Sequence, residues 1–318
     1  KDQICYLFGD VGGSFVNLYV DAYFLVFCTY VLGVSTYFMG TLFLVARIWD
    51  AINDPLMGSI PDRHMLGKSG DRFKPYIKLF MVPLALSGVL CFTDVSGFAD
   101  LWKHAWVCFA YIAYGMCYTG ASMPYGSLAT VITSDPVENA KLSRARSFGG
   151  AIVGILLAVV PQFIYDKDTN PVPAAFFVIA IIFGLGSILA YTILLSGSTE
   201  RIHYEVKRDT FKYGEVLKNC MHNRPLIGCM VAAVGFLFYN TGFGQISSYM
   251  FKEYYHDTSI ITFATLITMP LMLLIFPMIP KLVRRFGKVG SVLYPCLGGV
   301  ALCALLFFIP IRNPWIYL

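Results

Sequence analysis

The sequence predicts an all-α protein that crosses a membrane many times. Of its 318 residues, 57% are hydrophobic and only 14% are charged, whereas soluble domains carry about 25% charged residues. Several apolar stretches approach or exceed the ~20 residues that a helix needs to span a bilayer. Lys and Arg are also distributed unevenly between alternate connections of these stretches, as in polytopic membrane proteins.

The hydrophobic stretches define nine expected spans in chain order. They are residues 11–32, 37–60, 76–96, 104–133, 147–165, 173–196, 225–250, 259–280 and 289–311. The chain stops on an apolar run after Asn313, so we expect a tenth span to begin there and the sequence to be incomplete at its C-terminal end. The N-terminus lacks the basic start and the cleavage site of a signal peptide, so the first stretch is expected to be retained.

The charge pattern predicts which connections face the cytoplasm. Eighteen Lys and Arg residues lie in the connections that follow the second, fourth, sixth and eighth spans, and only four lie in the remaining connections. By the positive-inside rule, the N-terminus and these four connections are cytoplasmic. The net charge of +5 is therefore interpreted as a feature of topology, not as the mark of a nucleic-acid partner. The nine cysteines mostly lie in apolar runs and are interpreted as small buried hydrophobic residues.

The longest polar stretch divides the chain into two parts. We expect an N-terminal bundle of six helices at 1–196, a cytoplasmic linker at 197–224, and the first part of a C-terminal bundle at 225–318. Residues 200–218 suggest a short amphipathic helix. A basic, glycine-containing turn follows both the second and the eighth span, which is typical of transporters built from parallel repeats.

The second span carries an acidic face. Asp50, Asn53 and Asp54 share one side of a helix, because positions i, i+3 and i+4 are neighbours there. Carboxylates at bilayer depth are costly and indicate function. Pro55 removes a backbone donor and is expected to open the helix locally. The face predicts a site for a small cation or a proton, and the alternative is a structural network in which the carboxylates pair with Arg47.

Three further segments carry polar groups. On the first span, a stripe at helical spacing indicates either a polar substrate path or hydrogen bonding between helices; it consists of Asp10, Ser14, Asn17 and Asp21. In the fourth span, Pro124 suggests either an interrupted helix near a ligand or a kinked packing helix, and Thr119 offers another oxygen. Near the start of the fifth span, Arg146 is interpreted either as an interfacial anchor or as a gate and substrate cation.

These residues resemble a known family, the glycoside–pentoside–hexuronide:cation symporters of the major facilitator superfamily, which includes the melibiose permeases. The specific match is the stretch from Gly40 to Gly58, with its Arg-Ile-Trp-Asp-Ala-Ile-Asn-Asp-Pro core. Supporting matches lie at 72–76, 118–119, 124–125 and 127–128. The resemblance covers effectively the whole chain and implies a fold of twelve helices in two bundles.

The resemblance implies roles for individual residues. It assigns the site for a monovalent cation (sodium, proton or lithium) to Asp50, Asn53, Asp54 and Thr119, and it places Arg146 near the sugar. The expected sugar-binding set is Ser14, Asn17, Asp21, Ser122, Tyr125 and Arg146. The expected gating set is Arg47, Asp62, Arg63, Lys74, Arg284 and Arg285.

The chain departs from the melibiose permeases on the sugar side. Ser14 and Ser122 stand where those proteins have carboxylates, and Gly126 stands where they have tryptophan. An α-galactoside is therefore not the expected substrate. Asp21 lies on the same face as Ser14 and could replace the lost carboxylate. The two serines keep an anionic sugar possible, whereas Asp21 argues against one.

The sequence thus predicts a symporter in the cell (plasma or inner) membrane that carries a sugar with Na⁺ or H⁺ by alternating access. We expect it to need no cofactor beyond the coupling ion, to catalyse no reaction and to work as a monomer in the bilayer. The alternatives are a sugar sensor that does not transport, and a membrane prenyltransferase suggested by the spacing of Asp50 and Asp54. The latter would need a second aspartate-rich motif, which the sequence lacks.

Overall fold

The computed structural model of the chain describes residues 2–64, 66, 71–165, 171–202, 222–249, 271 and 275–308. These residues are almost entirely helical, and their only β-type pairing is an isolated bridge between Tyr165 and Pro171. The prediction of an all-α protein is confirmed for them. The chain divides into two compact units, Lys1–Lys207 and Arg208–Leu318, which are described separately below.

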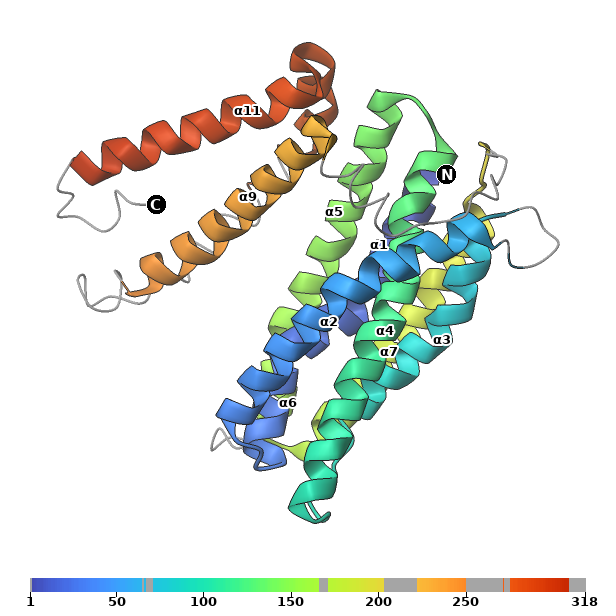
Figure 1. The fold of residues 1–318 in the computed structure, drawn as a ribbon, viewed down its shortest axis with the longest axis vertical. Coiled ribbons are helices and arrows are strands. Elements are labelled where there is room, and N and C mark those ends of the chain that lie inside the picture. The colour runs from blue at the N-terminus through green and yellow to red at the C-terminus, as the bar shows by residue number, and fades with distance from the viewer. Residues whose placement is uncertain are drawn as a thin grey trace. The chain divides into compact units, whose positions relative to one another are not determined.

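Unit 1 is a bundle of long helices (Figure 1). In chain order they are α1 (Asp2–Val26), continued by the π-helical turn η1 (Phe27–Val31), α2 (Thr36–Arg63), α3 (Lys74–Cys91), α4 (Asp100–Ile132), α5 (Pro136–Val159), the short α6 (Pro161–Ile164) and α7 (Pro173–Gly197). The helix α1 packs against α5 and α7, α3 packs against α4 and α7, and α2 packs against α4.

Two helices of unit 1 begin earlier than their hydrophobic stretches predict. The helix α1 starts at Asp2 instead of residue 11, and α5 starts at Pro136 instead of residue 147. Asp135 caps α5, since its side chain accepts a hydrogen bond from Val137 N at 3.0 Å. The basic segment that was expected to be a connection is therefore the first part of α5. Arg146 lies inside this helix rather than near its start.

The helices α2 and α4 run without a break through their prolines. Pro55 lies inside α2 and Pro124 inside α4, and both helices continue for at least two turns on either side. The structure therefore favours the packing-helix alternative for the fourth span, and a local opening at Pro55 stays a prediction. Each proline removes only one backbone hydrogen bond, and the neighbouring helices hold the backbone in place.

Four helical segments among the described residues are long and apolar enough to cross a membrane. They are Asp2–Val31, Lys74–Cys91, Pro136–Ile164 and Pro173–Gly197, and a bent pair at Ile279–Gly287 and Val289–Ala304 would make a fifth. The helices α2 and α4 are also long, with 28 and 33 residues, but they are more polar. These two helices carry most of the candidate site.

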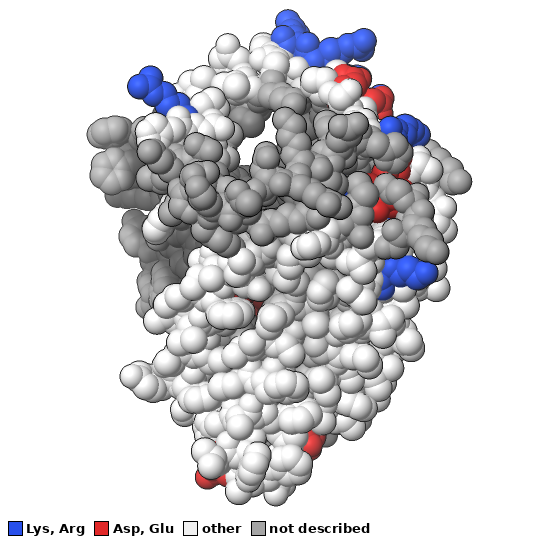
Figure 2. Space-filling model, turned by 45° about the vertical axis from the view of Figure 1, so that its right-hand side comes forward, with Lys and Arg blue, Asp and Glu red and all other residues white. Residues whose placement is uncertain are grey.

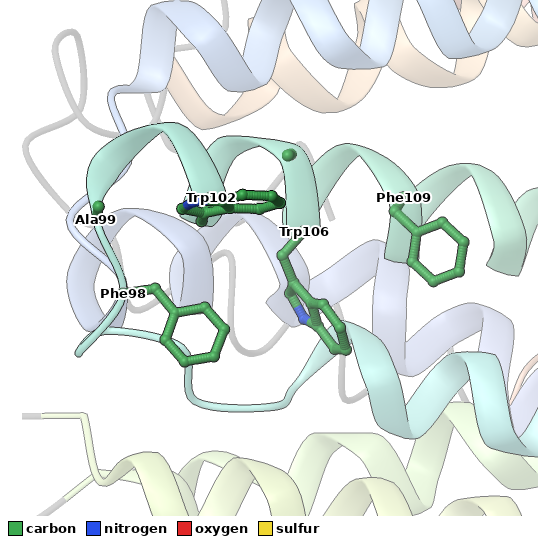
Figure 3. A pocket seen from close by; sticks show the side chains of 6 residues that line it. Phe98, Ala99, Trp102, Trp106 and Phe109 are labelled. Atoms are coloured by element: carbon green, nitrogen blue, oxygen red, sulfur yellow. The ribbon is translucent and has the colours of Figure 1, made fainter.

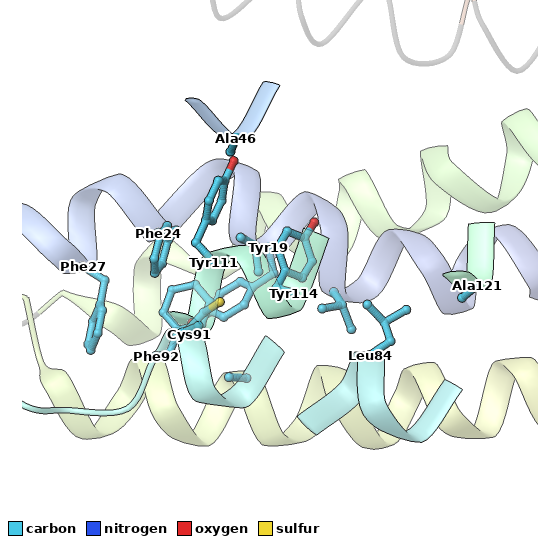
Figure 4. Close-up of a cluster of buried hydrophobic side chains, with 14 of the residues drawn as sticks. Tyr19, Phe24, Phe27, Ala46, Leu84, Cys91, Phe92, Tyr111, Tyr114 and Ala121 are labelled. Atoms are coloured by element: carbon cyan, nitrogen blue, oxygen red, sulfur yellow. The ribbon is translucent and has the colours of Figure 1, made fainter. Parts of the chain in front are cut away.

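The centre of unit 1 is an aromatic core contributed by several helices (Figure 4). Phe24 stacks on Tyr111 with a ring-centroid distance of 5.2 Å, and Tyr19 packs against Phe92 at 4.4 Å. Buried aromatic rings contribute large contact areas and packing preferences beyond area alone. This core joins α1, α3 and α4 and gives the polar site beside it a rigid support.

The segment after α7 is tied to three other helix ends. The Glu200 carboxylate is buried and accepts hydrogen bonds from the backbone nitrogens of Arg72, Phe73 and Lys74 at 2.8, 2.9 and 3.0 Å. It thereby satisfies donors at the start of α3, where a negative charge is favourable. The backbone nitrogen of Arg201 donates to Val131 O at 2.9 Å near the end of α4, and its guanidinium pairs with Asp2 in α1.

Unit 2 contains the helices α9 (Arg224–Tyr249) and α11 (Ile279–Phe308), with a short 3-10 turn, η3 (Phe276–Met278), before α11. The helix α11 bends by 105° at Gly287, whose φ of 73° suits glycine. The basic segment expected to be a turn after the eighth span is therefore helical, with a bend at its Gly287. Most of the predicted span 259–280 and of the predicted amphipathic helix 200–218 lies outside the described residues, and the predicted domain boundaries stay a prediction.

Figure 2 shows a broad area of surface in which few Lys, Arg, Asp or Glu residues are in view. Apolar side chains are also exposed along the long helices, among them Leu44, Leu86, Phe109 and Leu185. Exposed apolar surface of this extent is expected where helices contact lipid.

Candidate functional site

A polar pocket of about 200 Å³ lies within unit 1, between α1, α2 and α4. Its lining residues are Asn17 and Asp21 of α1, Ala46, Arg47, Trp49, Asp50 and Asp54 of α2, and Tyr111, Ile112, Tyr114, Gly115, Tyr118, Thr119, Ser122 and Met123 of α4. Ligand pockets usually measure about 300–1,000 Å³, so this one suits an ion or a small ring. We call it the α1–α2–α4 pocket.

One wall of this pocket is built by matching turns of α2 and α4. The Thr119 hydroxyl donates a hydrogen bond to Asp54 Oδ1 at 2.9 Å. One turn earlier on both helices, Asp50 faces Gly115, where an added Cβ would lie 3.7 Å from Asp50 Oδ1. Because residues four apart share a helix face, the two carboxylates and the threonine line up along a single seam. Three of the four residues expected to bind the cation are therefore together.

Asn53 is the fourth residue expected at the cation site, and it lies slightly apart. It is buried, with 4% of its surface exposed, and it is not among the residues that line the pocket. Its Nδ2 has no hydrogen-bond partner among the described residues. An unpaired buried amide costs about 1–3 kcal/mol, and turning the amide over would exchange its nitrogen for an oxygen. Asn53 thus has a polar group ready for a further partner within one turn of both carboxylates.

The opposite wall is provided by α1. Tyr114 of α4 donates to Asn17 Oδ1 at 2.7 Å, and Asn17 Nδ2 donates to Asp21 Oδ2 at 3.1 Å. These two bonds set the orientation of the Asn17 amide, since its oxygen accepts and its nitrogen donates. The carboxylate of Asp21 is thereby positioned on the pocket wall facing α2.

Arg47 lies at the mouth of the pocket. Its Nη1 is 3.5 Å from Asp50 Oδ2, and 68% of its side chain is exposed. An ion pair that is this exposed is weak. The pairing that the structural alternative expected between Arg47 and the acidic face is present for Asp50. Asp54 is instead held by the Thr119 hydroxyl.

Three residues of the expected sugar-binding set lie outside the pocket. Arg146 Nε is 3.1 Å from Asp10 Oδ1, and the Ser14 hydroxyl donates to Asp10 Oδ2 at 3.3 Å. The guanidinium also lies over the ring of Tyr125, 5.4 Å from its centroid. The Tyr125 hydroxyl donates to the backbone oxygen of Tyr6 at 2.8 Å, so it is committed to the contact between α1 and α4. These residues form a second group, which we call the Asp10–Arg146 cluster.

The Asp10–Arg146 cluster depends on a close approach of α1 and α5. A Cβ added at Gly149 would lie 2.7 Å from the backbone oxygen of Leu7, so only glycine fits there. Sequence reasoning placed Asp10 in the polar stripe but did not find its partner, which lies 136 positions away. It also missed Tyr118, Tyr111 and Trp49 as pocket residues. Aromatic residues are common both in pocket walls and in hydrophobic cores, so their residue type alone does not identify them as pocket residues.

The residues expected to act as gates are distributed over both units. Lys74 Nζ donates to Ser198 O at 2.8 Å and lies 3.8 Å from Asp71 Oδ2. The side chains of Asp62 and Arg63 lie outside the described residues. In unit 2, Arg284 and Arg285 are exposed, and Arg285 lies over the ring of Phe286. A latch between the two units stays a prediction.

Two other pockets are lined by apolar residues. One, of about 480 Å³, is formed by Phe98, Ala99, Trp102, Ala105, Trp106 and Phe109 at the start of α4 (Figure 3). The other, of about 620 Å³, lies among apolar residues of α5, α6 and α7. Polar ligand sites need convergent polar groups, which the α1–α2–α4 pocket has and these two lack.

Long helices around a pocket with carboxylates on two walls define a polytopic membrane protein of the transporter class. The chain belongs to the MFS/sugar transport protein family, whose model matches residues 5–318. The predicted kinship with the glycoside–pentoside–hexuronide:cation symporters is thereby confirmed.

Several curated bacterial proteins are similar to the chain. They include the uncharacterized symporter YnaJ of Bacillus subtilis, 26% identical over 100% of this chain and 68% of its own length. The isoprimeverose transporter of Lactiplantibacillus pentosus is 28% identical over 92% of this chain and 61% of its own length. The glucuronide carrier protein homolog of Escherichia coli is 24% identical over 96% of this chain and 66% of its own length. The chain thus spans about two thirds of the length of these relatives.

Proposed function

We propose that the protein is a cation-coupled sugar symporter whose coupling site is the seam between α2 and α4. The observation that carries this proposal is the alignment of Asp50, Asp54 and Thr119 along one wall of a polar pocket. Two carboxylates and a hydroxyl oxygen are hard ligands of the kind that small cations prefer. Membership in a family of sugar transporters supplies the class of substrate.

The coupling step follows from charge. Asp50 and Asp54 lie one helical turn apart on the pocket wall, so their negative charges repel each other. A sodium ion or proton that binds between them removes this repulsion, with Asn53 supplying a further oxygen. Because coupling between two sites is reciprocal, a cation that favours the sugar-binding conformation raises sugar affinity, and the sugar raises cation affinity.

The sugar site is proposed to begin at the α1 wall of the same pocket. Asn17, Asp21 and Ser122 line this pocket and offer acceptors and donors for sugar hydroxyls. Tyr118 adds a partly apolar face of the kind that packs against sugar rings. The relatives named for isoprimeverose and glucuronide support a sugar or glycoside substrate.

The Asp10–Arg146 cluster is proposed to lie beside this site without lining it. Its guanidinium is half exposed and already holds one carboxylate. It could reach a larger glycoside that extends beyond the α1–α2–α4 pocket. The cytoplasmic location of the N-terminus, the bilayer as surroundings and function as a monomer belong to the same proposal.

The alternatives make different demands on the protein. A sensor would bind sugar without moving it, so exchange of labelled sugar across vesicles would be absent. A prenyltransferase would consume a diphosphate with Mg²⁺, and the family match to sugar transporters favours transport over this reaction.

Uptake of a sugar panel into proteoliposomes, with and without Na⁺ at two pH values, tests the proposal. Wild-type uptake should be stimulated by one of the two cations. Asp54→Asn should abolish that stimulation, because it removes a charge that the cation neutralises. Exchange of labelled for unlabelled sugar across the membrane should persist in this variant. Asp94→Asn is the control, since Asp94 lies outside the pocket in the connection before α4. Stimulation that survives in Asp54→Asn would show that the coupling site is elsewhere.

A further inference from the structure

The charges that line the α1–α2–α4 pocket are unbalanced. Its ionisable acidic and basic residues are Asp21, Asp50, Asp54 and Arg47. One guanidinium offsets one carboxylate, and one bound monovalent cation offsets a second. A third carboxylate is therefore left without compensation when the proposed coupling site is filled.

Asp21 is the pocket carboxylate that makes no ion pair with a described residue, although the charge of Arg47 also acts on it. Arg47 lies beside Asp50, and Asp54 is bonded to Thr119 within the seam between α2 and α4. Asp21 is on the other wall, and one of its oxygens, Oδ2, accepts from Asn17. Its Oδ1 accepts no hydrogen bond from any residue that the structure describes, so it stays available to a ligand on the pocket side.

The position of Asp21 is set by a chain of two hydrogen bonds that begins on another helix. The Tyr114 hydroxyl is buried in α4 and donates to Asn17, which in turn donates to Asp21. A carboxylate held in this way loses little freedom when it binds a ligand, which favours affinity and selectivity. Tyr114 and Asn17 are thus positioning residues for Asp21.

The other strong cation of the neighbourhood does not compensate Asp21. Arg146 is not among the residues of the pocket. Its Nε is engaged by Asp10, whose side chain is only 15% exposed. The described part of the pocket therefore offers an anionic sugar a single basic side chain, Arg47, against three carboxylates.

We propose that Asp21 determines substrate specificity: it accepts hydrogen bonds from hydroxyl groups of uncharged sugars and excludes sugars that carry a carboxylate. The Asp21 carboxylate and a sugar carboxylate would repel each other inside the pocket, whereas hydroxyl groups donate favourably to an ionised carboxylate. This inference rests on the proposed function and specifies its substrate class as uncharged sugars.

The test compares matched pairs of competitors that differ only at C6. Methyl β-glucoside with methyl β-glucuronide, and methyl β-galactoside with methyl β-galacturonide, compete with a transported sugar in proteoliposome exchange. The readout is the ratio of half-inhibitory concentrations within each pair. Wild-type protein should favour the uncharged member at least tenfold.

The variants separate the role of Asp21 from general damage. Asp21→Asn should reduce the ratio about tenfold, chiefly by strengthening inhibition by the uronide. Tyr114→Phe keeps the carboxylate but frees Asn17, and it should reduce the ratio partially with the fold of the helix intact. Asp100→Asn, at the exposed start of α4, is the control and should leave the ratio unchanged.

A wild-type preference for the uronides would overturn the inference. So would an unchanged ratio in both Asp21→Asn and Tyr114→Phe. Failure of the proposed function would be seen differently. If no cation stimulates sugar exchange, cation coupling is contradicted, but the ratio of half-inhibitory concentrations can still be measured. Absence of exchange with every sugar would overturn both.

Discussion

Thr119 connects the two helices of the proposed coupling site through a single hydroxyl group. Its bond to Asp54 at 2.9 Å joins α4 to α2 inside a poorly solvated region. Hydrogen bonds to charged groups contribute about 1.5–3 kcal/mol. The same hydroxyl oxygen has lone pairs left for a cation, so Thr119 can position a carboxylate and bind the ion.

Replacing Thr119 by valine, which has the same shape without the hydroxyl, should weaken cation binding. We expect the cation concentration that gives half-maximal sugar uptake to rise about tenfold, which corresponds to about 1.4 kcal/mol. The matched control is Thr130→Val on the same helix, where the hydroxyl donates to the backbone oxygen of Ser127 at an exposed position. Equal effects of both changes on cation dependence would contradict a role for Thr119 in the site.

Residue-scale features of the site differ in how far the sequence could predict them. The i, i+4 spacing of Asp50 and Asp54 predicted a shared face, and both line the pocket. The expectation that Tyr125 belongs to the sugar-binding set did not foresee the bond of its hydroxyl to Tyr6, because contacts 119 positions apart have no local signal. The roles of the residues at the site remain predictions.

Helix α5 shows how hydrophobicity misplaces the ends of a polar element. Its first eleven residues include charged side chains and were expected to be a connection, yet Asp135 caps a helix that starts at Pro136. A side-chain cap followed by proline is itself a signal for a helix start. The packing of α5 against α1 then buries Gly149 and brings Arg146 to Asp10.

Gly149→Ala should force α1 and α5 apart. The added Cβ would meet backbone oxygen at 2.7 Å, which cannot rotate away, and overpacking of this kind costs about 1–3 kcal/mol. Gly154→Ala on the same helix has nothing within 4 Å of the added Cβ, so it should be neutral or slightly stabilising. Thermal unfolding of the purified proteins in detergent measures both. A lower melting temperature in Gly154→Ala than in Gly149→Ala would contradict the packing argument.

At the scale of the whole molecule, composition was enough to predict the all-α fold and its membrane setting. The long helices of unit 1 agree with six of the nine expected spans, and the ends differ most at the polar N-terminal parts of α1 and α5. Composition could not predict that α2 and α4 continue through proline, because the support comes from neighbouring helices. The predicted orientation of the spans in the bilayer rests on the charge of the connections and not on packing.

The predicted orientation can be checked by labelling single cysteines. His64→Cys, at the end of α2, should react with an impermeant maleimide only when the reagent has access to the cytoplasmic side, as in inside-out membrane vesicles. Ser96→Cys, in the connection between α3 and α4, should react from outside in intact cells. Both positions are exposed, and the unmodified protein gives the background from native cysteines. The reverse pattern would show that the N-terminus is outside.

The ties around Glu200 have a consequence for movement of the chain. One short segment, Ser198–Ile202, holds the beginning of α3 through Glu200 and the end of α4 through its backbone nitrogens. It also holds the beginning of α1 through Arg201. A displacement applied to the residues that follow it is therefore delivered to three helices at once and not to α7 alone. Beyond α7, the described polypeptide therefore continues through a junction that is bonded to three other helices.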